Sequence, residues 1–297
     1  PFGGFGAAEA GNALGGSGPD GAQVPGLRPP LRAGLVETLL GTFEGARLRK
    51  AGLVGEVLLL PPEHPSSSAL DSVHFRLANT VFARVDKVHM DPNNARVVDS
   101  KAGVMEGKYA GGGSSIVLEQ QQPTLLLRYK VGAALFAPPV RVRVSAVTLA
   151  RGYPELGKGE VAQMLVVQLM VSPHLESPPL SEFVVDVHIP WSNPPAKVSP
   201  AATWGRKQRR LLWKLGTLPP GEQRMCRAVF SSEEGGVRKL QRALRGAEAR
   251  VRFLGAGRTH TGVQVAVQPA PGAAKAPDNV AVEHCLQGHL RALVGRG

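Results

Sequence analysis

The chain has 297 residues, enough for one large domain or two of modest size. Its formal net charge of +12 favours anionic partners, and a basic surface that serves only solubility is the alternative interpretation. No apolar run approaches the roughly 20 residues that span a bilayer, and the first residues lack the basic and apolar regions of a signal peptide. With 36 glycines and 25 prolines, the composition favours many short strands joined by turns over a helical fold.

The first part of the chain changes from a linker composition to a strand pattern. Residues 1–30 are rich in glycine, alanine and proline and have no hydrophobic periodicity, so we expect a flexible linker. Residues 31–50 carry leucines at helical spacing, but each of their glycines would cost a helix about 1 kcal/mol, and we expect a strand instead. A further strand is expected over 52–60, where Pro61 and Pro62 end it.

Period-two alternation of apolar and polar residues, which is typical of half-buried strands, recurs through the middle of the chain. This alternation and one long apolar run predict strands at 73–80, 124–131, 140–147 and 164–173. The last of these has few polar residues, so we expect both of its faces to be covered. Turn-forming residues predict loops over 91–115 and 151–160.

The most distinctive stretch runs over 183–215. Its first residues alternate between an apolar face and a face that carries Asp186. After a proline-rich link, Trp204 and Trp213 bracket a polar and basic tip, which predicts a hairpin. Gly205 is expected to begin the turn with a positive φ.

The last third of the chain combines one helical pattern with further strand patterns. Leucines at helical spacing, surrounded by arginine and lysine, predict a short cationic helix within 237–251, after a loop at 231–236. Two strands around a glycine-rich turn are expected over 251–269, and a closing strand or strand pair over 279–294.

Two motifs resemble a known family. FVVDVHIP at 183–190, followed by PAATWGRKQRRLLWKL at 200–215, resembles the mu-homology domain, and most closely its muniscin branch, which includes the FCHo endocytic proteins. In that family an alternating strand leads to a PATW segment and then, after a charged turn, to a strand reading RLxWKL. VHFRLANT at 73–80 is similar to the family's LSFRLKNT. The resemblance covers roughly residues 31–297 and is strongest over 181–268.

The resemblance implies an all-β, elongated mu-homology domain of two β-sandwich subdomains, the second inserted into the first. The linker would occupy 1–30 and the domain 31–297. Subdomain A would combine 31–150 with 251–297, and subdomain B would take 151–250.

The resemblance also implies a non-enzymatic adaptor that binds short linear motifs of endocytic scaffold proteins and cargo tails in early clathrin-mediated endocytosis. The expected location is cytoplasmic, at plasma-membrane clathrin-coated pits. Two alternatives stay open: a medium-subunit-like component of another vesicle coat complex, and a basic module that binds nucleic acid or membrane. Nucleic acid is the weaker option, because the sequence offers few aromatic residues for base stacking.

The tyrosine-signal pocket of clathrin-adaptor medium subunits is not carried over to this chain. That pocket uses a WVRY-like run on the last strands, whereas residues 281–293 read AVEHCLQGHLRAL, with no tryptophan and no matching arginine. The difference favours the muniscin type. The KRRF run of typical muniscins is also missing near this end, which indicates a divergent member.

Two basic clusters are the candidate site for anionic lipid, phosphoinositides included, or for acidic peptide, because charge-assisted hydrogen bonds to such groups are strong. A solvated hairpin end and helix face are the alternative interpretation. The first cluster surrounds the hairpin and the second lies on the expected helix: Arg206, Lys207, Arg209, Arg210 and Lys214, then Arg238, Lys239, Arg242 and Arg245.

Motifs for catalysis and for metal binding are missing from the sequence. It has no GxSxG motif, no HExxH pair and no CxxC pair. His284 and Cys285 are adjacent, and adjacent strand residues point to opposite faces, so they are not expected to act as base and nucleophile. We therefore predict no catalytic residue, no metal and no cofactor. Cys226 and Cys285 are expected to be buried free thiols in a reducing compartment.

Overall fold

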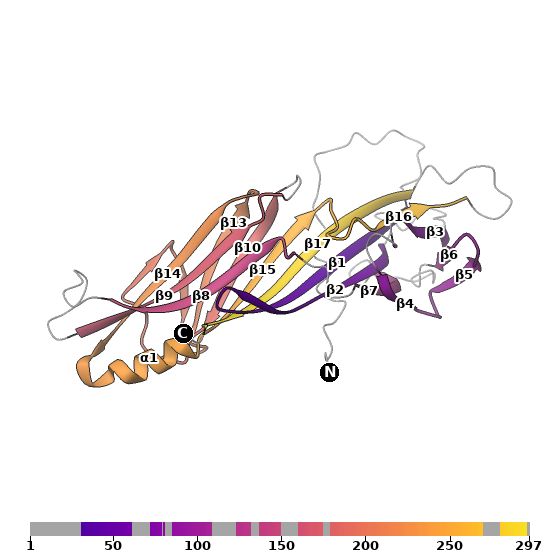
Figure 1. Cartoon of the computed structure of the whole chain (residues 1–297). Helices are drawn as coiled ribbons and strands as arrows, with labels where there is room; N and C mark the ends of the chain where they lie inside the picture. Colours follow the sequence, from indigo (N-terminus) through magenta and orange to yellow (C-terminus); the bar gives the residue numbers. More distant parts are fainter. Residues whose placement is uncertain are drawn as a thin grey trace, which may run out of the picture. The chain divides into compact units, whose positions relative to one another are not determined.

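The computed structural model describes residues 31–60, 72–78, 80, 85–108, 123–131, 137–149, 160–174, 179–269 and 280–295. The linker expected at 1–30 and nearly all of the turn expected at 151–160 lie outside these residues. Strands dominate the described chain, which confirms the all-β fold class (Figure 1). None of the helices in this part has the length and apolar composition needed to cross a bilayer.

Each stretch predicted as a strand contains one, although a turn divides the strand expected over 31–50, and the strands at 85–90, 197–199 and 223–233 were not predicted. The strands of the first half are β1 (Leu31–Glu44), β2 (Arg47–Leu60), β3 (Ser72–Ala78), β4 (Val85–Met90), β5 (Ala95–Asp99), β6 (Val104–Lys108), β7 (Thr124–Val131) and β8 (Val140–Thr148). Those of the second half are β9 (Glu160–Val171), β10 (Leu180–His188), β11 (Lys197–Ser199), β12 (Thr203–Gly205), β13 (Arg210–Leu218), β14 (Gln223–Glu233), β15 (Glu248–Ala256), β16 (Gln264–Val267) and β17 (Val280–Leu293). The helix α1 (Val237–Arg245) lies between β14 and β15.

The chain forms two compact units. Unit 1 takes its described residues from Pro1–Thr38, Leu53–Gly132 and Ala256–Leu286, and unit 2 from Leu39–Gly52, Ala133–Gly255 and Gln287–Gly297. Strands β1, β2 and β17 contribute residues to both, and β15 does so through its last residue, Ala256. The subdomain bounds that the resemblance implies stay a prediction.

Unit 1 contains two sets of paired strands. β2, β7 and β4 are antiparallel neighbours, and β16, β3, β6 and β5 form a separate four-stranded sheet. The two strands expected over 251–269 are therefore not partners, because β16 pairs with β3 while β15 belongs to another sheet. Phe75, Leu126 and Leu127 are among the buried core residues.

β5 and β6 correct the expectation of a loop over 91–115, of which the last seven residues lie outside the described chain. The two strands pair antiparallel, and Arg96 Nε donates to Glu106 Oε2 across them at 2.5 Å. Asp99 Oδ1 accepts the backbone N–H of Lys101 at 2.9 Å and so stabilises the turn between the strands. The turn-forming residues that suggested a loop lie at the ends of two short strands.

Unit 2 contains the tryptophan-flanked hairpin. β12, β13, β10 and β15 are consecutive neighbours in one sheet, and β11, β14, β9 and β8 form a second. Phe183, Val185 and Trp213 are fully buried on one face of the first sheet. The Trp213 indole N–H donates to the Pro200 carbonyl oxygen at 3.0 Å, and Trp204 packs edge-on against Phe230 with ring centroids 6.3 Å apart. Both tryptophans are thus used for packing.

β9 does not have the two covered faces that its apolar run suggested. Leu165 and Leu169 are fully buried on one face, whereas Val166 and Met170 on the other face are half-buried. β9 pairs with β14 on one side and β8 on the other. Its composition therefore reflects its central place in the sheet, with an outer face that stays partly open.

α1 confirms the expected cationic helix but is shorter than the pattern. It ends at Arg245, Gly246 follows as the C-cap, and Leu240 and Leu244 are buried. The helix contacts β8, β9 and β14. The loop expected over 231–236 is wrong for its first half, because β14 extends to Glu233 and pairs there with β9.

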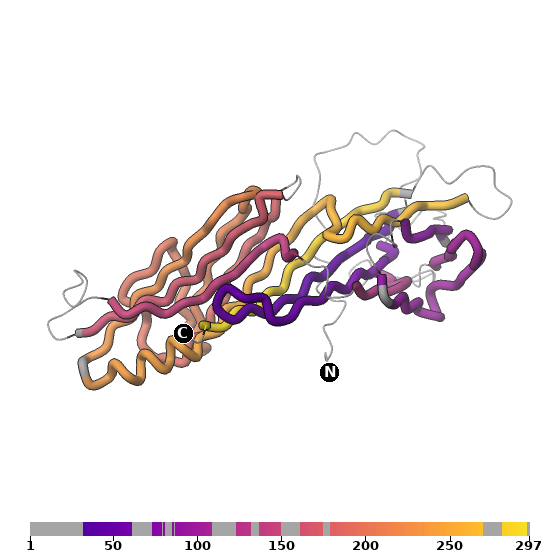
Figure 2. The backbone as a smooth tube through the Cα atoms, in the orientation of Figure 1, coloured from indigo at the N-terminus to yellow at the C-terminus, as the bar shows by residue number. Residues whose placement is uncertain are grey.

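The end of β17 lies beside the turn that joins β1 and β2 (Figure 2). Gly45 N donates to Leu293 O at 3.1 Å, and Gly45 has a φ of 58°. A Cβ on Gly295 would lie only 2.9 Å from the Gly45 Cα, so this close approach requires glycine.

Candidate functional site

The first predicted cluster lies on the β12–β13 hairpin of unit 2. Gly205 and Arg210 are paired, so the residues between them form the turn. Arg206, Lys207 and Arg209 in this turn are all exposed. The structure thus places three of the predicted cations together at the hairpin tip.

The residue with left-handed backbone geometry in this turn is Arg209, with a φ of 53°. The expectation that Gly205 would supply a positive φ is wrong, because Gly205 is the last residue of β12. Left-handed geometry costs a residue other than glycine about 1–2 kcal/mol. Such residues are concentrated at functional sites.

The solvent side of β13, β10 and β15 forms a surface that we call the open basic face. Val184 pairs with both Lys214 and Arg252, so these three residues form one row across the strands. In the next row Asp186 lies between Leu212 and Arg250. Lys214 and Arg252 are two strand spacings apart, about 9–10 Å.

Ion pairs neutralise only part of this face. Arg210 Nη1 lies 3.1 Å from Asp186 Oδ2. Glu248 binds two arginines: its Oε1 lies 3.0 Å from Arg250 Nε and its Oε2 lies 2.5 Å from Arg291 Nη2. Burial acts to raise the pKa of Glu248, but hydrogen bonds and charges from these two arginines outweigh it and hold the pKa below its ordinary value. Glu248 therefore stays ionised.

Lys214 and Arg252 have no acidic partner among the described residues. Counted with Arg210, Arg250 and Arg291, they give the open basic face more cations than carboxylates. The face lies on paired strands, so its charges are held by a rigid element. It is chemically suited to carboxylates or phosphates.

The second predicted cluster lies on α1. Arg238, Lys239, Arg242 and Arg245 are all exposed, and the last two lie in the final turn, where cations interact favourably with the helix dipole. Glu248, the first residue of β15, follows shortly after this helix. His188 of β10 pairs with both Glu248 and Arg210 of β13, so these residues form one row across the strands. The nine predicted residues thus occupy two separate elements, a hairpin and a helix.

Sequence reasoning missed Arg250, Arg252 and Arg291. The first two alternate with the buried residues Ala249 and Val251, a pattern that marks them as outward-facing. The sequence does not reveal that β15 lies two strands from β13, because that proximity depends on pairing between distant segments. The open basic face could be recognised only from the strand register.

A different surface lies in unit 1, where an apolar groove of 410 Å³ borders β3, β4, β5 and β6. It is lined by Leu77, Thr80, Val85, Val88, Val97, Ser100, Gly103 and Met105. Val88 and Val97 are 47% and 48% exposed. None of the described residues that line this groove is charged, so their chemistry suits apolar ligand side chains and differs from that of the open basic face.

Unit 1 also contains a buried polar cluster around Glu37 of β1, which is 0% exposed. Its Oε1 accepts the Tyr129 hydroxyl at 2.6 Å and also the Thr261 hydroxyl. Its Oε2 accepts the backbone N–H groups of His260 and Thr261 at 2.5 and 3.0 Å. Burial, followed by the charge of Glu37, raises the pKa of Tyr129. All four donors have the Glu37 carboxylate as acceptor, which indicates that the cluster holds residues 260–261 beside β1.

His260 gives this cluster a pH dependence. Burial, and secondarily the charge of Arg258, lowers its pKa to about 4. In the unfolded chain the imidazole of His260 binds a proton near pH 6.5, whereas in the folded chain it does so only near pH 4. The contribution of this residue to the free energy of unfolding is therefore fully present above pH 6.5 and is lost as pH falls towards 4. We expect the free energy of unfolding to fall over this window by on the order of 3 kcal/mol from this residue.

Urea denaturation at about pH 7 and about pH 4 measures this effect. His260→Gln keeps the backbone N–H that binds Glu37 and removes the titrating ring. The variant is expected to lose less stability on acidification than the parent chain, whereas equal losses would show that His260 does not contribute.

The cysteines are free and buried, as predicted. Burial raises the pKa of Cys226 to about 12, although Arg224 acts to lower it, so its reactive thiolate is scarce at neutral pH. Within the described ranges, no group of three or more histidine, cysteine, aspartate or glutamate side chains could hold a metal ion.

Comparison with protein families matches residues 29–279 to the muniscin C-terminal mu homology domain. Among solved structures, the chain is similar to the Fcho1 mu homology domain of Danio rerio with bound Eps15 peptide, with a TM-score of 0.59 and 15% identity over 90% of this chain and 98% of that chain. No curated protein matches.

Two yeast structures are similar as well. The delta-COP-I mu-homology domain has a TM-score of 0.56 and 13% identity, covering 92% of this chain and 100% of that chain. Its complex with the Dsl1 WxWxV peptide has a TM-score of 0.57 and 13% identity, covering 89% and 98%. These likenesses show the fold.

Proposed function

Because the chain belongs to the muniscin C-terminal mu homology domain family, we propose that it is a non-enzymatic adaptor in early clathrin-mediated endocytosis. It binds short linear motifs of endocytic scaffold proteins and cargo tails, on the cytoplasmic side of plasma-membrane coated pits. The solved relatives with bound Eps15 and Dsl1 peptides support peptide binding as the activity of this fold.

The observation that carries the proposal is the open basic face together with the hairpin tip. The cations of the open basic face lie on paired strands, and two of them, Lys214 and Arg252, have no acidic partner in the described chain. Acidic residues of a flexible peptide can pair with them through charge-assisted hydrogen bonds. Phosphoinositide headgroups present the same anionic chemistry, so membrane contact is a further role for this surface.

Charge reversal at the hairpin tip tests this role. The triple variant Arg206→Glu, Lys207→Glu, Arg209→Glu is expected to weaken binding of an Eps15 peptide at least about tenfold, since each exposed pair contributes up to about 1 kcal/mol. Arg210 is left unchanged because it pairs with Asp186. Fluorescence anisotropy with the labelled peptide measures the change.

The control is an equal change of charge on exposed lysines of unit 1: Lys87→Glu, Lys101→Glu and Lys130→Glu. The control variant should bind within about twofold of the parent chain once salt screens long-range effects. Equal weakening by both triples would mean that net charge, and not the hairpin, determines binding. Phosphoinositide-bearing vesicles in a parallel assay separate lipid binding from peptide binding.

A component of another vesicle coat is the second candidate, because delta-COP domains share this fold at almost the same similarity. This alternative predicts that the chain binds the Dsl1 WxWxV peptide more tightly than the Eps15 peptide. It also predicts that large and small coat subunits purify together with the chain. Tighter binding of the Eps15 peptide, without such subunits, favours the endocytic function.

A further inference from the structure

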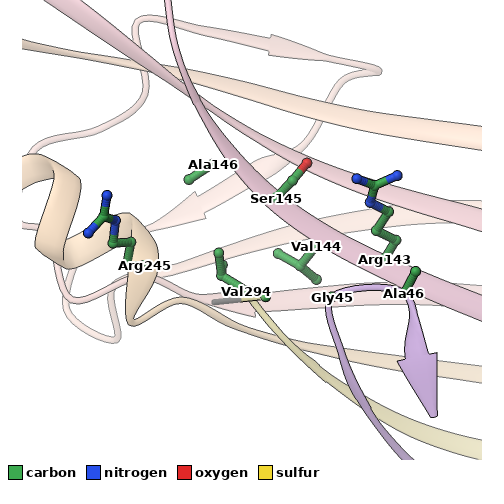
Figure 3. Close-up of a pocket in the computed structure, with 9 residues that line it drawn as sticks. Gly45, Ala46, Arg143, Val144, Ser145, Ala146, Arg245 and Val294 are labelled. Carbon is green, nitrogen blue, oxygen red and sulfur yellow. The ribbon is translucent and has the colours of Figure 1, made fainter. Parts of the chain in front are cut away.

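A groove in unit 2 brings together four separate parts of the chain (Figure 3). They are the β1–β2 turn, strand β8, the C-terminal end of α1 and the residues that follow β17. Its volume of 710 Å³ falls in the range of ligand sites. The lining residues are Gly45, Ala46, Arg143, Val144, Ser145, Ala146, Arg245, Val294 and Gly295. We call it the β8-edge groove.

The described residues that line this groove carry charge of one sign. Arg143 and Arg245 are both exposed, and none of the other described lining residues is acidic. In the view of Figure 3, Val144 and Val294 lie between the two arginines. The described chain offers neither arginine an acidic partner. The groove is therefore suited to a ligand that presents negative charge beside a short apolar floor.

The groove also exposes a strand edge. β8 is the last strand of its sheet, and Leu149 N donates to Ala162 O of β9 at 3.1 Å. Because backbone groups alternate in direction along an antiparallel strand, the N–H and C=O of Ala146 and Thr148 point away from β9. On that side the described chain pairs β8 through one parallel bridge, between Val144 and Val294.

We propose that the β8-edge groove binds an extended acidic peptide segment of a partner protein by strand addition. The backbone of the peptide would pair with Ala146, next to the existing bridge, while its carboxylates pair with Arg143 and Arg245. A phosphate or lipid headgroup could use the arginines but not the strand edge. The inference rests on the proposed peptide-binding function and assigns it a second site, apart from the open basic face.

Arginines on an edge strand also discourage unwanted pairing, and this role predicts a different result. If the arginines served only to protect the edge, substitution of Arg141 or of Arg143 should have the same effect, because both are exposed and alternate with buried residues along β8. Arg242 likewise matches Arg245 as an exposed cation in the last turn of α1. Neither Arg141 nor Arg242 lines the groove. These two residues are therefore matched controls.

The test uses the full chain and a fluorescein-labelled octapeptide of alternating glutamate and valine, with anisotropy as the readout. Arg143→Glu combined with Arg245→Glu should raise the Kd at least about tenfold, and Arg141→Glu combined with Arg242→Glu less than about threefold. Ala146→Pro removes the outward N–H without changing charge, at an edge where proline is tolerated, and should raise the Kd at least about fivefold.

The proposal would be overturned by no binding of the octapeptide, by equal weakening in both arginine pairs, or by full binding of the Ala146→Pro variant with an unchanged denaturation midpoint. Displacement of the octapeptide by inorganic phosphate at equal concentration would show a simple anion site and would also overturn it. If the groove variants bind all peptides normally while the hairpin-tip variant does not, the β8-edge groove is not a peptide-binding site, and the proposed function is retained. Failure of the parent chain with every peptide would reject both.

Discussion

Replacing Glu37 with alanine is expected to lower the free energy of unfolding by about 3–5 kcal/mol. The carboxylate is fully buried and accepts hydrogen bonds from Tyr129, Thr261 and the backbone of the 260–261 segment. Without it, these donors remain buried with no acceptor, and each neutral donor left in this way costs about 1–3 kcal/mol. Chemical denaturation followed by circular dichroism measures the loss.

Glu44→Ala on the same strand is the matched control. Glu44 pairs with Arg49 at 2.8 Å, but both side chains are partly exposed, so its loss should cost less than about 1 kcal/mol. Similar destabilisation by the two variants would contradict the structural role of the buried cluster. The amides of His260 and Thr261 should also lose their protection against hydrogen exchange in the Glu37 variant only.

Gly55→Ala is expected to destabilise the chain by about 2–4 kcal/mol. Gly55 lies opposite Tyr129 in the β2–β7 pair, and a Cβ there would lie 2.0 Å from the Tyr129 ring. The ring must move, which also disturbs the hydrogen bond from its hydroxyl to Glu37. A small methyl group would thus destabilise both the packing and the polar cluster.

Gly52→Ala on the same strand provides the comparison, since nothing lies within 4 Å of the Cβ that it would add. This variant should be neutral or stabilised by up to about 1 kcal/mol, because alanine restricts the unfolded chain. If both glycine variants lose the same stability, β-propensity rather than the Tyr129 contact explains the result. The effects of Gly55→Ala and Glu37→Ala should also be less than additive, because they disturb one hydrogen bond.

Local patterns in the sequence were sufficient to predict most strands and the helix. The alternation in 140–147 and 183–189 corresponds to β8 and β10, whose buried residues lie on one face as predicted. The resemblance of 200–215 to a family motif correctly identified the hairpin and the family. These features depend on residues close together in the chain, which is why a single sequence reveals them.

Features that depend on distant residues were missed. The β5–β6 pair was hidden because its two short strands are dominated by the turn residues around them. Arg252 joins Lys214 only through β10, and Arg143 meets Arg245 only through the packing of α1 near β8. The sequence also gave no indication that Glu37, an ordinary charged residue in a strand pattern, would be fully buried.

The central claim is that partner peptides bind to the basic surfaces of unit 2. The most direct test is to record amide chemical shifts of the isotope-labelled full chain while the endocytic scaffold peptide is added. Shifts should concentrate at the hairpin tip, around Lys214 and Arg252 on the open basic face, and around Ala146 at the β8 edge. Shifts confined to unit 1, around Val88 and Val97 of the apolar groove, would contradict the claim.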